Sequence, residues 1–164
     1  MNDATQAQEQ DIVLTRIFDA PRELVFQAWT QPAHLARWWA PEGCTTQVRE
    51  LDLRPGGRFH FCMRTPDGQD VWGLGIYREI VVPERLVYLD SFADADGNPV
   101  PPTHYGLSAG HPPETLVTVT FAAQGGRTLL TLRHAIPLPV AERGATQQGW
   151  SEMLERLAGL LTAL

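Results

Sequence analysis

A helical spacing of apolar residues at the C-terminal end constrains the fold more than any other feature of the sequence. Six large apolar side chains recur there at helical intervals: Trp150, Met153, Leu154, Leu157, Leu161 and Leu164. Polar residues such as Glu152 and Glu155 occupy the other side. The pattern predicts an amphipathic helix of about 18 to 22 residues, roughly 27 to 33 Å long. Such a helix needs an apolar surface as long as itself, for example one face of a sheet.

Six segments upstream of this helix have the composition of β-strands. They are rich in β-branched and aromatic residues and comprise residues 45–53, 58–64, 71–81, 85–92, 116–122 and 128–134. Short turns such as Pro55-Gly56-Gly57 and Gly125-Gly126 separate most of them. Connections this short join antiparallel neighbours, so the predicted sheet is antiparallel. Residues 93–114 are rich in Pro and Gly and form the exception, a connection long enough to be functional or mobile.

A further strand and two short helices are predicted near the N-terminus. Residues 11–18 have strand composition and end just before Pro21. Proline suits the first turn of a helix, because its missing N–H would have no partner there. Pro32 ends this first helix and opens a second, over residues 33–39.

These elements together predict an α+β arrangement in which a curved antiparallel sheet grips the long C-terminal helix. The chain has 164 residues, of which 43% are hydrophobic, and this is enough for a single core. We expect one domain over residues 11–164, preceded by a flexible polar tail over residues 1–10. That tail resembles neither a signal peptide nor a transit peptide, which predicts a cytoplasmic protein.

The charge of the chain excludes several classes of partner. The formal net charge is -6, and the sequence contains no basic run, so we expect neither nucleic acid nor an anionic membrane surface as a partner. No apolar run approaches the ~20 residues that span a bilayer. Cys44 and Cys62 lack metal-ligand spacing and are expected to be reduced. The sequence predicts no metal site and no cofactor.

Several short motifs, taken in order, resemble a known superfamily. They are residues 18–21 (FDAP), 25–30 (VFQAWT), 32–39 (PAHLARWW), 53–59 (LRPGGRF), 75–80 (GIYREI) and 149–157 (GWSEMLERL). Their order and spacing resemble the SRPBCC or START-like superfamily, and within it a single-domain, bacterial-type member of the heat-shock protein 90 ATPase activator-like family. The resemblance implies a START-like domain with a helix-grip fold. It also implies a cavity between the concave sheet and the last helix, where relatives hold lipids, steroids, polyketides or other apolar molecules.

The aromatic residues are the candidates for the wall of that cavity. Trp and Tyr carry polar tips that a dry core must satisfy, so some of them are expected at a boundary. Aromatic walls with a few hydrogen-bonding tips are typical of small-molecule sites. The predicted ligand-binding residues are Trp38, Trp39, Phe61, Trp72, Tyr88, His134, Trp150 and Met153. The leading hypothesis is therefore a protein that binds a small apolar or aromatic molecule.

The histidines are the candidates for catalytic or metal-binding groups. His34 and His60 are expected at the surface. His104 and His111 lie in the Pro-rich connection with a spacing that matches no helical zinc motif. His134 ends a strand, where it is either a hydrogen-bonded core residue or a general acid or base that points into the cavity. No residue is assigned as catalytic.

Two other function classes remain open. The first is a cyclase or aromatase type of enzyme, in which His134 would act with Glu50 or Asp52. A solvated strand face with Arg58 or Arg64 as a cross-strand partner also explains these two carboxylates. The second is a chaperone-associated or other protein-interaction module, or a homodimer, to which residues 93–114 would contribute an apolar surface.

Overall fold

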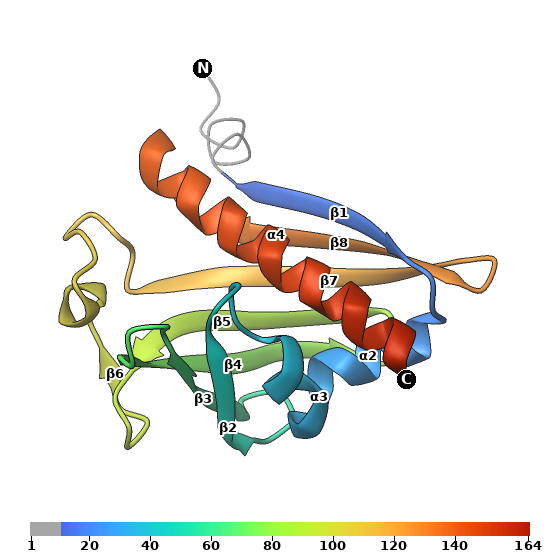
Figure 1. The fold of residues 1–164 in the computed structure, drawn as a ribbon, viewed down its shortest axis with the longest axis horizontal. Coiled ribbons are helices and arrows are strands. Elements are labelled where there is room, and N and C mark those ends of the chain that lie inside the picture. The colour runs from blue at the N-terminus through green and yellow to red at the C-terminus, as the bar shows by residue number, and fades with distance from the viewer. Residues whose placement is uncertain (1–10) are drawn as a thin grey trace.

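The C-terminal pattern forms helix α4 (Val140–Ala163), which lies across one face of an antiparallel sheet (Figure 1). The structure is a computed structural model that describes residues 11–164. The predicted tail, residues 1–10, lies outside the described residues. Helix α4 has 24 residues, slightly more than predicted. Five of the six predicted apolar residues are buried, whereas Leu164 is exposed because it follows the last helical residue.

Within residues 11–164 the sheet has eight strands, and all the pairings are antiparallel. The strands are β1 (Ile12–Phe18), β2 (Thr45–Leu51), β3 (Arg58–Arg64), β4 (Asp70–Val81), β5 (Arg85–Ala93), β6 (Pro99–Val100), β7 (Glu114–Gln124) and β8 (Arg127–Ala135). Seven of them follow the order β1-β8-β7-β5-β4-β3-β2, and β6 pairs with β5. This architecture confirms the predicted α+β helix-grip fold, with a curved antiparallel sheet around the last helix.

The long connection 93–114 contains more structure than the sequence indicated. It includes the short strand β6 and the 3-10 helix η1 (Pro102–Tyr105). The Tyr105 hydroxyl donates to the backbone oxygen of Ala93 at 2.6 Å and accepts from the backbone N–H of Trp72 at 3.1 Å. One side chain thus attaches this segment to strands β4 and β5.

Two short helices follow β1, as predicted: α2 (Arg22–Thr30) and α3 (Pro32–Trp38). Trp38 is fully buried between them, and its indole N–H donates to the backbone oxygen of Ala28 at 2.8 Å. The Trp29 ring packs edge-on against it, with centroids 4.8 Å apart. Both rings therefore belong to the core that joins α2 to α3.

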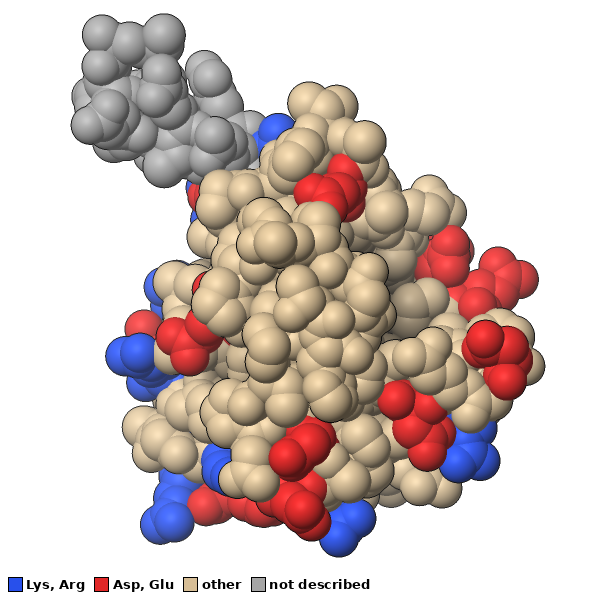
Figure 2. Space-filling model, turned by 90° about the vertical axis from the view of Figure 1, so that its left-hand side faces the viewer, with Lys and Arg blue, Asp and Glu red and all other residues tan. Residues whose placement is uncertain are grey.

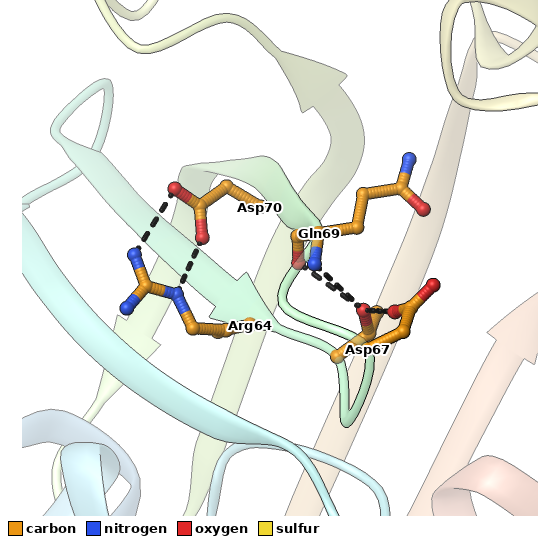
Figure 3. Close-up of polar contacts among 5 residues, drawn as sticks. Arg64, Asp67, Gln69 and Asp70 are labelled. Carbon is orange, nitrogen blue, oxygen red and sulfur yellow. Dashed lines mark hydrogen bonds and ion pairs between the residues drawn. The ribbon is translucent and has the colours of Figure 1, made fainter.

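The β3–β4 hairpin shows how the turn residues set the register on the outer side of the sheet (Figure 3). Arg64 and Asp70 form a two-pronged ion pair across the strand ends, with N–O distances of 2.8 and 3.3 Å. Inside the turn, the Thr65 hydroxyl donates to the Asp67 carboxylate and accepts from the backbone N–H of Gln69 at 3.1 Å. These contacts close the turn locally and leave the opposite face of the strands to the core.

The inner face of the sheet depends on a glycine beneath an aromatic ring. Gly73 of β4 lies between Phe61 and Phe92 in the register of β3, β4 and β5. A Cβ atom at Gly73 would lie 2.2 Å from the tip of the Phe61 ring. The absent side chain is what allows this ring to lie flat over the strand.

The described part of the chain contains neither a membrane-spanning helix nor a cluster of metal-binding side chains. No helix among residues 11–164 has both the length and the apolar character needed to cross a membrane. Nor do these residues contain a group of three or more His, Cys, Asp or Glu side chains arranged to hold a metal ion.

Arg156 attaches α4 to the segment between α3 and β2. Its guanidinium donates to the backbone oxygens of Ala40 at 2.8 Å, Cys44 at 3.2 Å and Arg37 at 3.2 Å. Replacing it by methionine keeps most of the aliphatic stem and removes these bonds. We expect Arg156→Met to lower the free energy of unfolding by about 1 to 3 kcal/mol, because hydrogen bonds from a charged donor contribute more than neutral ones. Urea unfolding measures this change.

The matched control is Arg54→Met, which removes an exposed guanidinium paired with Asp52 at 2.7 Å. Exposed ion pairs contribute little, so its expected loss is below about 1 kcal/mol. Equal losses in the two variants would contradict the anchoring role of Arg156.

Candidate ligand cavity

A cavity of about 360 Å³ lies between the inner face of the sheet and the first half of α4. Helix α4 contributes Ala145, Thr146, Gly149, Trp150 and Met153. The sheet contributes Phe61, Met63, Asp90, Phe92 and His134. The remaining lining residues are Trp39, Pro41, Leu107, His111 and Ile136. Most of these side chains are apolar. Figure 2 shows the molecule from the end where residues 101–113 and the start of α4 lie. On this face, charged side chains surround a central surface that carries no charged residues.

Aromatic rings form much of the cavity wall. Trp39 follows the last residue of α3, and its ring packs edge-on against Trp150 of α4 at 5.6 Å and against Phe61 of β3 at 5.9 Å. Phe92 of β5 also lines the cavity and contacts the His111 ring at 5.9 Å. Elements far apart in the sequence thus contribute rings to one wall, and these rings hold each other in place.

His134 lies at the centre of a hydrogen-bonded chain on this wall. The Trp150 indole N–H, which can only donate, bonds to Nδ1 of His134 at 3.0 Å. Nδ1 must therefore accept, and Nε2 carries the proton and donates to the Thr115 hydroxyl oxygen at 2.8 Å. Burial, with a smaller contribution from His111, lowers the pKa of His134 to about 4. His134 is thus a neutral, hydrogen-bonded residue, as the first predicted alternative describes, and it also lines the cavity.

Asp90 is the lining residue that sequence reasoning missed. It lies on β5, opposite Gly75 of β4 and Thr115 of β7. Its carboxylate has no hydrogen bond and no ion pair with any residue in 11–164. Burial raises its pKa to about 7. A signal was present in the sequence, because Tyr88, Asp90 and Phe92 alternate along one strand and must share a face.

Comparisons with known proteins place the chain in a family. The model for "Activator of Hsp90 ATPase homolog 1-like protein" matches residues 19–162. The chain belongs to this family. A crystal structure from Chromobacterium violaceum is 32% identical, with 93% of this chain and 96% of that chain covered and a TM-score of 0.75. One from Mycobacterium smegmatis is 27% identical, with 96% and 94% covered and a TM-score of 0.78.

A further structure, described as the AHSA1 protein from Silicibacter pomeroyi, is 24% identical over 93% of this chain and 98% of that chain, with a TM-score of 0.72. It shares the fold. No curated protein matches this chain. Membership of the activator of Hsp90 ATPase homolog 1-like family therefore establishes the fold. The kind of molecule that the cavity binds has to be inferred from the residues that line it.

Five of the eight predicted ligand-binding residues lie together on the cavity wall. Trp39, Phe61, His134, Trp150 and Met153 all line the cavity. Whether they contact a ligand stays a prediction. Trp38, Trp72 and Tyr88 lie elsewhere, each for a different reason.

Trp38 belongs to the buried contact between α2 and α3, whereas Tyr88 packs behind Trp39, with ring centroids 6.3 Å apart. The Tyr88 hydroxyl is buried without a hydrogen-bond partner among the described residues, and burial raises its pKa well above the usual value. Trp72 lies on the outer side of the sheet, where its ring contacts His60 and the Arg49 guanidinium, the latter at 5.7 Å. These three residues do not line the cavity.

The prediction that His60 lies at the surface is wrong. His60 does lie on the strand face opposite Phe59 and Phe61, but it is only 2% exposed. Its Nε2 lies 2.9 Å from the backbone oxygen of Asp94, and the Trp72 ring packs beside it at 5.0 Å. Residues distant in sequence cover this face, so alternation along the strand did not reveal the burial. His34 is half-buried and His104 is exposed.

Glu50 and Asp52 do not join His134. Glu50 pairs with Arg58 at 3.8 Å and Asp52 with Arg54 at 2.7 Å, and both carboxylates are substantially exposed. Neither lines the cavity. The arrangement required by the cyclase or aromatase hypothesis is therefore not present. Glu50 has the predicted cross-strand partner Arg58, whereas Asp52 pairs with Arg54 instead.

Proposed function

We propose that the chain binds a small, largely apolar molecule in the cavity beneath α4. The observation that carries this proposal is a cavity of about 360 Å³ with an aromatic wall, within the size range typical of small-molecule sites. Its only hydrogen-bonded polar chain, Trp150–His134–Thr115, is satisfied internally among the described residues and does not require water. Because most of the lining is apolar, the cavity favours a largely apolar occupant over solvent.

Family membership supports this proposal, because the helix-grip arrangement leaves the cavity between sheet and helix. A cytoplasmic location, a homodimer and a chaperone partner stay predictions. No second function is proposed, since Glu50 and Asp52, the carboxylates that the enzyme hypothesis requires, do not line the cavity.

Titration with N-phenylnaphthylamine, an uncharged apolar probe whose fluorescence rises in apolar surroundings, tests the proposal. Binding is expected to saturate at one probe per chain, with energy transfer from the tryptophans. Excess propylnaphthalene, which has no polar group, is expected to displace the probe. A linear rise without saturation, or no displacement, would count against a cavity site.

A further inference from the structure

The cavity contains one acidic group that the rest of the wall leaves unsatisfied. The Trp150 indole, His134 and the Thr115 hydroxyl oxygen satisfy one another. The Asp90 carboxylate lines the same cavity and has no partner in residues 11–164. The lining includes no arginine, and the sequence contains no lysine. No arginine or lysine is therefore available on this wall to neutralise Asp90; of the two histidines that line it, His134 is held neutral and His111 packs against the Phe92 ring.

A lone carboxylate in an apolar cavity is costly for the folded protein. Removing a carboxylate from water without a partner costs several kcal/mol, and proteins normally pair such groups. Gly75, opposite Asp90 on β4, contributes no side chain and therefore no partner for the carboxylate. The carboxylate is thus accessible from the cavity and has an unmet need for a positively charged hydrogen-bond donor.

The surrounding rings favour the same kind of ligand. Trp39, Phe61, Phe92 and Trp150 line the cavity together with Asp90. Aromatic faces attract cations, and a carboxylate inside a group of aromatic rings offers an ammonium both a charge partner and a ring surface. An anionic ligand would meet repulsion from Asp90, and a hydrocarbon would leave the carboxylate unpaired.

From this juxtaposition we infer that the ligand is an amine with an apolar or aromatic body, whose N–H groups bind the Asp90 carboxylate. The inference rests on the proposed function, since it names the class of ligand for the same cavity. The protonated nitrogen would bond to Asp90, and the body would lie against Trp39, Phe92 and Trp150 beneath α4.

Calorimetry with three probes of similar shape tests this inference: naphthylethylamine, propylnaphthalene and naphthylacetate. At about pH 8 the amine is expected to bind at least about tenfold more tightly than propylnaphthalene, and naphthylacetate more weakly than both. Asp90→Asn is expected to abolish the preference for the amine, because it weakens binding of the amine and does not weaken binding of propylnaphthalene. The exposed Asp96 provides the matched control, because Asp96→Asn should keep the preference.

The outcomes separate the two proposals. Equal affinity for the amine and propylnaphthalene, or tighter binding of naphthylacetate, would overturn the amine inference and leave the proposed function standing. No binding of any probe would overturn both. A preference for the amine that survives in Asp90→Asn would also overturn the inference, because the carboxylate would then play no part.

Proton exchange at about pH 7 gives a second readout, measured as the dependence of the binding heat on the buffer. The amine is expected to release protons from Asp90, whereas propylnaphthalene, which buries the carboxyl further, is expected to take them up. The other titratable groups around the carboxyl are His111, His134 and Tyr88. Subtracting the Asp90→Asn result isolates the contribution of Asp90, and equal signs for the two probes would contradict the inference.

Discussion

Replacing Asp90 by asparagine is expected to raise the free energy of unfolding by about 2 to 4 kcal/mol at about pH 8. Burial raises the pKa of Asp90 in the folded protein to about 7, well above its unfolded value. Ionisation at high pH therefore opposes folding, and the amide removes this cost while it keeps the shape of the side chain. The expected gain is smaller than the full pKa shift would give, because Asp90 is partly accessible.

Two buried groups make the stability of the wild type depend on pH in opposite directions. The free-energy cost that ionised Asp90 imposes on the folded state is absent below about pH 4 and grows as the pH rises to about 7. His134 changes the free energy of unfolding with pH in the opposite direction, because its pKa in the folded protein, about 4, lies below its unfolded value of 6.5. Stability from His134 is therefore complete above its unfolded pKa and is lost as the pH falls toward 4. Between about pH 4 and 6.5 the two contributions nearly cancel in the wild type.

In the wild type, the contribution of Asp90 thus masks the pH dependence that comes from His134. Urea unfolding of Asp90→Asn over this pH range should reveal it. Asp90→Asn is expected to lose stability on acidification more steeply than the wild type, by about 1.4 kcal/mol per pH unit at most. Asp96→Asn, at an exposed position, should follow the wild type within about 0.5 kcal/mol. An Asp90→Asn variant that is less stable than the wild type at about pH 8 would show that the carboxylate is not desolvated.

Filling the cavity from α4 is the second change with a large expected effect. Gly149 lines the cavity, and a Cβ atom there would have Pro41 as its nearest neighbour, at 3.9 Å. A longer side chain on a helix leans toward the N-terminal end, here over Ala145, which also lines the cavity. Gly149→Leu is therefore expected to occupy ligand space and weaken binding of N-phenylnaphthylamine by at least about tenfold.

The folded state should tolerate this substitution. Glycine is a poor helix former, so leucine is expected to maintain or raise the free energy of unfolding, by up to about 1 kcal/mol. Gly144→Leu is the matched control, since Gly144 lies on the same helix and is exposed, and a Cβ atom there would have no neighbouring atom within 4 Å. Wild-type affinity in Gly149→Leu, or an equal loss in Gly144→Leu, would place the probe outside the cavity.

The fold could be predicted from local patterns because each element carries its own signal. The apolar spacing from Trp150 to Leu161 set α4, and the limits of β3 at Arg58 and Arg64 agree with the prediction. Strand β6 was missed because two residues, Pro99 and Val100, are too few for any periodicity to appear. Pairing with β5 defines it, and that contact is set by tertiary structure.

The site was less predictable, because neighbouring residues of the same type have different surroundings. Trp38 is the last residue of α3 and turns toward Ala28, whereas Trp39 leaves the helix and turns toward the sheet. Nothing in the adjacent letters separates these two directions. The bond between His134 and Trp150 likewise joins β8 to α4 and depends on where the helix crosses the sheet.

Asp90 escaped prediction for a different reason. A carboxylate in a strand is ordinarily assigned to solvent, and the aromatic neighbours Tyr88 and Phe92 were interpreted without it. Alternation along β5 places all three on the inner face. An acidic residue between two inward-facing aromatic positions is therefore the pattern that would have indicated a polar group inside the cavity.

The methionine methyl groups offer the most direct test of the central claim, that the cavity beneath α4 binds a small apolar molecule. The chain has three methionines, and two of them, Met63 and Met153, line the cavity from the sheet and from the helix. In protein labelled with ¹³C at these methyl groups, titration with propylnaphthalene should shift the Met63 and Met153 signals with one common dissociation constant. Saturable binding that leaves both Met63 and Met153 unshifted would contradict the account.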